Sequence, residues 1–151
     1  MTVIPALIQP GVSTMSDITR VLARSTGTDY IVELGNPAGH HWRADEPAAL
    51  GGGDTAPDPM QLVLSALGAC TAITLRMYAK RKGWPLQQVD VELALNPAGK
   101  PASGNDIVRH LTVTGDLDAG QRERLVQLAN ACPVHKLLAG DIRIDTALAE
   151  N

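Results

Sequence analysis

The chain has 151 residues, the length of one domain, and its 16 acidic and 13 basic residues give a formal charge of −3 at pH 7. A mildly acidic chain has no electrostatic attraction to nucleic acid or to an anionic membrane, so we expect neither as a partner. Phe is absent and aromatic residues make up only 3% of the chain, so aliphatic side chains must build the core. Because each of these buries less area than an aromatic ring, oligomerisation would be a further source of burial.

We expect residues 1–17 to form a flexible N-terminal arm and residues 18–151 a single domain. The first 15 residues contain two prolines and lack the basic start of a signal peptide. This predicts a reducing, cytoplasmic environment, where paired cysteines are more often catalytic, redox-sensing or metal-binding than structural. The apolar run at residues 62–75 is too short to predict a membrane span.

The N-terminal third of the domain has the pattern of a β-hairpin followed by a third strand. Residues 18–25 and 30–34 are rich in β-branched and apolar side chains, with turn-forming residues between them. Residues 40–44 follow a second turn and predict another strand. The loop at residues 45–57 contains a glycine run at 51–53, which we interpret as a flexible turn because it lacks the spacing and lysine of a phosphate-binding loop.

A long helix is predicted over residues 59–82. Asp58 is a suitable N-cap, Pro59 suits the first helical position, and Gly83 ends the pattern. The helix is apolar nearly all round between Leu62 and Leu75, which predicts burial on most sides. Small residues surround Cys70 on this helix, and they leave room either for another backbone or for a ligand beside the sulfur.

The C-terminal half predicts two strands, two helices and a last strand. Alternating apolar residues indicate strands at 89–95 and 107–114 and again around Ile142 and Ile144. Asp118 begins a helix with Gln121 at the capping-box position, and a second helix follows at Pro133. The order of elements predicts an α+β fold with antiparallel strand pairing.

Cys70 and Cys132 are the candidate chemical groups. Cys132 precedes Pro133 and is the expected N-cap of a helix, where unpaired N–H groups and the positive end of the dipole lower the pKa of a thiol. A peroxide-reducing thiol also needs a second thiol to resolve the sulfenic acid and a cation nearby. The candidate cations are Arg20, Arg24, Arg43 and His135.

Two other uses of these residues stay open on the sequence alone. Cys132 and His135 have the spacing of metal ligands, and Cys70 with a histidine (His40, His41 or His110) could complete a tetrahedral site. A single short pair is a weak signal, so we expect no metal, and nothing in the sequence implies a cofactor. A free cysteine can also be simply a small buried apolar side chain.

The segments at residues 58–62, 66–72 and 132–135 together resemble the osmotically inducible protein C and organic hydroperoxide resistance (OsmC/Ohr) family. The resemblance implies an intertwined homodimer, with antiparallel sheets packed around central helices and both cysteines in a pocket at the subunit interface. It implies that Cys70 is the peroxidatic nucleophile and that Cys132 resolves it as a disulfide. It further implies organic hydroperoxides as substrates, a dithiol such as a lipoyl group as reductant, and a role in the oxidative stress response.

One position departs from the family pattern. The well-studied peroxidases carry a Glu ten residues before the first cysteine, where it orients an arginine from the N-terminal strands. Met60 occupies that position here, with Gln61 beside it as a weaker hydrogen-bonding partner for an arginine. We expect Arg24 to stabilise the thiolate, with Arg43 as the second choice. The missing carboxylate motivates an alternative function, a non-catalytic or weakly redox-active dimer that binds a small apolar ligand in its interface pocket.

Overall fold

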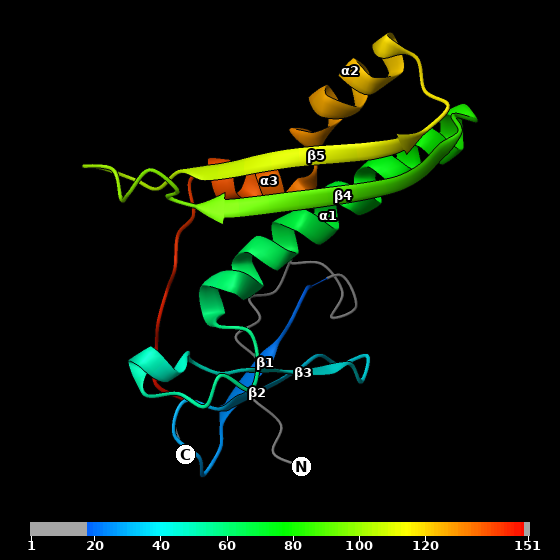
Figure 1. Ribbon diagram of the computed structural model, residues 1–151. Helices are drawn as coiled ribbons and strands as arrows, with labels where there is room; N and C mark the ends of the chain where they lie inside the picture. Colours follow the sequence, from blue (N-terminus) through cyan, green and yellow to red (C-terminus); the bar gives the residue numbers. More distant parts are fainter. Residues whose placement is uncertain (1–17, 150–151) are drawn as a thin grey trace. The chain divides into compact units, whose positions relative to one another are not determined.

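The computed structural model describes residues 18–149, which fall into two compact units divided between Pro59 and Met60 (Figure 1). The expected arm at residues 1–17 lies outside the described residues. The first unit contains three strands and a 3₁₀ turn: β1 (Leu22–Ser25), β2 (Val32–Gly35), β3 (His41–Ala44) and η1 (Ala48–Leu50). The second contains three helices and two strands: α1 (Pro59–Lys82), β4 (Leu86–Leu95), β5 (Ile107–Gly115), α2 (Ala119–Ala129) and α3 (Pro133–Ala139).

The first unit is a three-stranded antiparallel sheet in the order β1-β2-β3. The expected hairpin and third strand are confirmed, although β1 is shorter than the apolar pattern at residues 18–25 predicts. Every residue of β1 is exposed, so apolar character there does not reflect burial within this unit.

Asp45 organises the loop that follows β3. Its buried carboxylate accepts hydrogen bonds from the backbone N–H groups of Glu46, Gly53 and Thr55 and from the Thr55 hydroxyl. A Cβ atom at Gly52 would overlap the Glu46 carbonyl, so glycine is required at this close approach. Hydrogen bonds thus give a defined shape to the segment in which we expected a flexible turn.

The hydrogen bonds from the Thr55 hydroxyl and then from the loop N–H groups lower the pKa of Asp45 to about 2, against a raising effect of burial. Because the folded pKa lies below the unfolded one, this carboxylate stabilises the fold above about pH 4, and the contribution is lost as the pH falls through 2. We expect Asp45→Asn to lower the Tm by about 5 °C at pH 7, since an amide nitrogen cannot accept these bonds. Thermal unfolding from pH 7 to 2 should show the two proteins converging in acid, and a difference independent of pH would contradict this.

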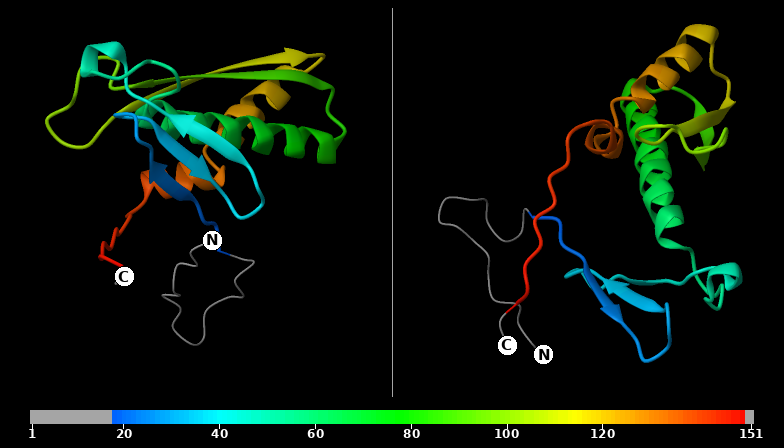
Figure 2. Two further views of the ribbon diagram at one scale, coloured as in Figure 1. Left: turned by 90° about the horizontal axis from the view of Figure 1, so that it is seen from below. Right: turned by 90° about the vertical axis from the view of Figure 1, so that its left-hand side faces the viewer.

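The second unit is a β4–β5 ribbon with all three helices on one face (Figures 1 and 2). The long helix has the predicted bounds, and the Asp118–Gln121 capping box is present. The two strands pair antiparallel, with Leu95 opposite Ile107 and a bulge near Leu86. The α+β class with antiparallel pairing is therefore confirmed.

The core of the second unit lies between the ribbon and the helices. Leu75 of α1 and Leu125 of α2 are fully buried there, together with Leu117. Alternate residues of β5 from Ile107 to Val113 face this core, whereas those between them face away. The residues packed around the three leucines are Trp84, Leu86, Val89, Leu111, Val113 and Leu128.

Two sequence predictions for this unit are wrong. Helix α1 buries a single stripe of residues four apart, Leu67, Thr71, Leu75 and Ala79, instead of most of its surface. The last strand is absent: residues 141–149 form no strand, and Ile144 is 84% exposed. A strand needs a neighbouring edge to satisfy its backbone groups, and within residues 18–149 this segment pairs with none.

Candidate thiol site

Cys132 is the fully buried N-cap of α3. Its sulfur accepts a hydrogen bond from the backbone N–H of His135, with 3.3 Å between nitrogen and sulfur. Pro133 occupies the first helical position, where its missing N–H costs nothing. The predicted cap is confirmed, and it aims the unpaired N–H groups of the first turn at the sulfur.

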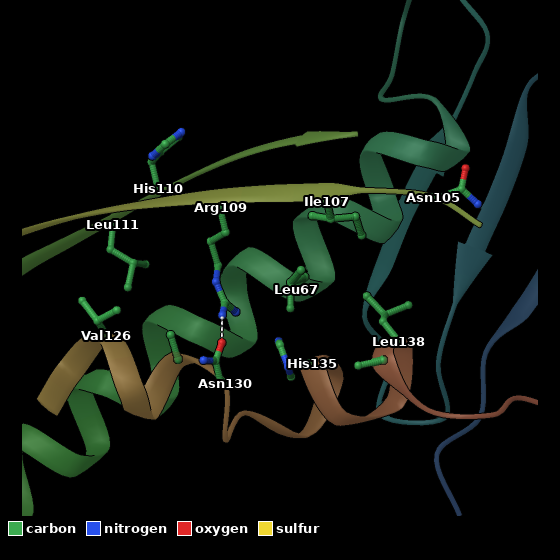
Figure 3. A pocket seen from close by; sticks show the side chains of 12 residues that line it. Leu67, Asn105, Ile107, Arg109, His110, Leu111, Val126, Asn130, His135 and Leu138 are labelled. Atoms are coloured by element: carbon green, nitrogen blue, oxygen red, sulfur yellow. Dashed lines mark hydrogen bonds between the residues drawn. The ribbon is translucent and has the colours of Figure 1, made fainter. Parts of the chain in front are cut away.

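Thr71 of α1 lies against the same sulfur. Its Oγ1 is 3.8 Å from the Cys132 Sγ, and the hydroxyl donates to the Leu67 carbonyl at 2.8 Å. The Arg109 guanidinium reaches this hydroxyl from β5 and donates to Oγ1 through Nη1 at 3.0 Å. Its other terminal nitrogen, Nη2, donates to Asn130 Oδ1 at 2.8 Å (Figure 3). Arg109 is therefore held at two points beside the cysteine.

Cys70 precedes Thr71 on α1, is half-buried, and lies close enough to Cys132 to lower the pKa of its thiol. Both thiols are free in this structure. The predicted meeting of the two cysteines is borne out, although they lie 62 positions apart in the chain.

The surroundings of Cys132 favour its thiolate. Burial raises the pKa of this thiol, but four interactions lower it, and the pKa lies below its ordinary value. In decreasing order these are the hydrogen bond from the His135 N–H, the side-chain contacts with Cys70 and with Thr71, and the positive charge of Arg109.

A cavity of about 540 Å³ lies beside this network (Figure 3). Its walls come from α1, β5 and the turn before it, α2 and α3, and they are mixed in character. The polar members are Asn105, Arg109, His110, Asn130 and His135. Apolar members include Leu67, Ile107, Leu111 and Leu138. Neither cysteine is among the lining residues, whereas Arg109 and His135, which both donate hydrogen bonds in the network around Cys132, are.

Four other predicted site residues belong to β1, β3 and the first turn of α1. Arg24 is on β1, opposite Glu33 of β2, and Arg43 on β3 forms an exposed ion pair with Glu33 at 3.0 Å. Met60 and Gln61 are both exposed in the first turn of α1. The roles assigned to these four residues stay predictions.

Sequence reasoning missed Arg109, Thr71 and Asn130. Arg109 occupies an inward position of β5, between Ile107 and Leu111, and a charged residue in the apolar register of a strand is a readable signal. Thr71 is likewise the polar member of the buried stripe of α1. Asn130 is the C-cap of α2 and carries no comparable signal.

Metal binding gains no support from the described residues, where no group of three or more potential ligands comes together. His40, one of the candidate ligands, pairs through Nδ1 with the side-chain amide of Asn36 at 3.1 Å.

Comparison with known proteins identifies the family. The sequence model described as OsmC-like protein matches residues 51–147. The chain belongs to the OsmC-like protein family. The match covers both cysteines and all five helices and strands of the second unit, so the site described above lies wholly within it. No curated protein matches the chain.

Solved structures share the fold. An OsmC-like protein from Mycoplasma pneumoniae is 17% identical with a TM-score of 0.69, over 83% of this chain and 90% of that one. The organic hydroperoxide resistance protein OsmC from Legionella pneumophila is 25% identical with a TM-score of 0.60, over 82% and 90%. The organic hydroperoxide resistance protein OhrB of Bacillus subtilis is 24% identical with a TM-score of 0.55, over 83% and 93%.

Membership of this family explains the apolar character of α1. The helix has 24 residues and is long and apolar enough to cross a membrane by length and composition alone. In the OsmC-like fold it is the core helix of a soluble protein.

The low pKa of Cys132 predicts a pH-dependent contribution to stability. Because the folded pKa lies below the unfolded one, ionised Cys132 stabilises the fold at pH values above the unfolded pKa, and this contribution is lost as the pH falls through the folded pKa. We expect the Tm of the reduced wild-type protein, minus that of Cys132→Ser, to increase as the pH rises from 5 to 9. Parallel Tm curves over this range would contradict the assignment.

Proposed function

We propose that this protein is a thiol-dependent peroxidase that reduces organic hydroperoxides through Cys70 and Cys132. The observation that carries the proposal is the pair of neighbouring free thiols in a chain of the OsmC-like family. Family members of similar structure are named organic hydroperoxide resistance proteins, which supports the substrate class.

Cys70 is the proposed nucleophile because it is the more accessible sulfur, whereas Cys132 is fully buried. The Cys132 thiolate takes the proton of the Cys70 thiol as the Cys70 sulfur attacks the outer peroxide oxygen. The O–O bond breaks, the sulfur becomes a sulfenic acid, and the alkoxide leaving group receives the proton from Cys132 as an alcohol. Cys132 is a thiolate again at the end of this step.

The second step forms a disulfide. The Cys132 thiolate attacks the Cys70 sulfenic sulfur, the S–O bond breaks, and hydroxide leaves and is protonated to water. A dithiol, such as a dihydrolipoyl group, then reduces the disulfide and is itself oxidised.

Arg24 is proposed to stabilise the Cys70 thiolate, with Met60 and Gln61 near the substrate. An arginine held by a carboxylate is more firmly placed than one held by a neutral amide. Gln61 therefore provides a weaker anchor for Arg24 than the glutamate of the well-studied peroxidases.

A cytoplasmic homodimer is the proposed assembly. Met77 and Ile73 of α1 are 68% and 58% exposed, and Ile144 and Leu148 of the C-terminal segment are still more exposed. A second copy of the chain would cover such apolar surface and supply a strand edge for residues 141–149. The aliphatic residues in the wall of the cavity beside Arg109 support a substrate with a hydrocarbon group.

Cys70→Ser tests the nucleophile. Reduced protein mixed with a bulky organic hydroperoxide and a dihydrolipoyl reductant should consume peroxide rapidly, and Cys70→Ser should lower the rate at least about 100-fold, because no sulfenic acid can form. A Ser65→Ala variant on the exposed side of the same helix is the control. Peroxide loss in Cys70→Ser at the parent rate would exclude this mechanism.

Cys132→Ser tests the resolving thiol. This variant should be oxidised once at Cys70 and then stop, since no second thiol is present to form the disulfide. Mass spectrometry after excess peroxide should find sulfinic or sulfonic acid at Cys70, whereas the parent protein should contain the Cys70–Cys132 disulfide. Full turnover without over-oxidation in Cys132→Ser would refute the assignment.

The cavity favours a second candidate function, a non-catalytic dimer that binds a small apolar ligand. Absence of peroxide consumption above the Cys70→Ser level, together with saturable binding of an apolar fluorescent probe, would support this alternative.

A further inference from the structure

Arg109 is a cation on the inward face of β5, and none of the proposed peroxidase steps uses it. It projects from the inward face of β5 toward α1 and α2 (Figure 3), and Thr71 and Asn130 fix its two terminal nitrogens. The charged or titratable groups around Cys132 come from three elements: Arg109 from β5, Cys70 from α1 and His135 from α3. Arg109 is the member that stays charged at every pH the protein experiences.

The Thr71 hydroxyl connects this cation to the sulfur. It has a single proton, which it gives to the Leu67 carbonyl while the sulfur lies 3.8 Å away. Arg109 donates to the same oxygen, which makes the hydroxyl proton a stronger donor. A thiolate is a better acceptor than a thiol, so rotation of this hydroxyl toward Cys132 stabilises the ionised form.

We propose that Arg109, held by Asn130 and acting through Thr71, is a positioning residue that keeps Cys132 as a thiolate and makes it the leaving group when the disulfide is reduced. The second half of this inference rests on the proposed disulfide. In thiol–disulfide exchange the sulfur with the more stable thiolate leaves faster, and the more accessible sulfur is attacked. Cys70 is half-buried and Cys132 has no exposed surface, so both effects select the same direction.

Reduction of the disulfide then takes place in two exchange steps. A thiolate of the reducing dithiol attacks the Cys70 sulfur, the S–S bond breaks, and its electron pair stays on Cys132 beside Arg109. The mixed disulfide therefore forms on Cys70. The second thiol of the reductant, after losing its proton, attacks the reductant sulfur of that bond, and the released Cys70 thiolate takes up a proton.

The first test measures the ionisation of Cys132 directly. In a Cys70→Ser background, thiolate absorbance near 240 nm is followed against pH, and the Cys70→Ser/Cys132→Ser double variant supplies the baseline. Arg109→Gln should raise the midpoint by about one pH unit, and Arg109→Lys should restore part of the difference. Arg76→Gln, which removes an exposed guanidinium bound to the Gln87 carbonyl, should leave the midpoint unchanged. Equal midpoints for Arg109→Gln and its parent would overturn the proposal.

The second test measures the direction of reduction and needs no peroxidase activity. The disulfide is formed in the full-length protein with diamide and reduced with an excess of monothiol, and acid-quenched samples are mapped by peptide mass spectrometry. The adduct should lie on Cys70, and Arg109→Gln should slow the reduction on the order of threefold. An adduct on Cys132, or an unchanged rate, would overturn the leaving-group assignment.

If Arg109→Gln does not fold, Thr71→Val tests the same connection, because it removes the bridging hydroxyl at nearly constant volume. It should raise the Cys132 midpoint and slow the reduction in the same sense, and wild-type values for both would overturn the proposal.

The two tests also separate the inference from the proposed function. Arg109-dependent titration and exchange without peroxide turnover would refute the peroxidase and leave the inference standing, whereas turnover with no dependence on Arg109 would do the reverse.

Discussion

The site depends on the hydrogen bond between the backbone N–H of His135 and the sulfur of Cys132. This bond makes a cysteine the N-cap of α3, so the sulfur both begins the helix and receives the field of its unpaired N–H groups. An ordinary N-cap uses a side-chain oxygen of Ser, Thr, Asn or Asp as the acceptor, whereas this one uses a thiol sulfur. Here the cap is itself titratable, and the local fold and the chemistry share one atom.

The inward face of the β4–β5 ribbon supplies the rest of that environment. Aliphatic residues of the two strands pack on Leu75 and Leu125, and Arg109 interrupts this apolar register beside the thiols. A guanidinium at such a position is costly unless its donors are paired. The bonds to Thr71 and Asn130 provide partners for both terminal nitrogens, and they also place the positive charge near Cys132.

The two thiols differ in exposure as well as in electrostatics. Cys70 is reachable from outside and Cys132 is not, whereas the cation and the helix terminus both serve Cys132. This division of properties suits a pair in which one sulfur reacts with external reagents and the other alternates between the thiolate and the disulfide. The resemblance of the sequence to OsmC and Ohr proteins had assigned the same division of roles, with Arg24 serving Cys70 from the N-terminal strands.

The sequence by itself determined the features that depend on neighbouring residues. Pro59 and Gly83 mark the ends of α1, Asp118 and Gln121 form the capping box, and Pro133 predicts the N-cap at Cys132, because caps and turns act over a few residues. The tertiary structure decided which distant residues meet. Arg109 reaches Thr71 across 38 residues, and only the packing of β5 against α1 brings them together. The predicted strand around Ile142 and Ile144 failed for the same reason, since alternation shows that a segment can pair but its partner edge is a property of the assembled fold.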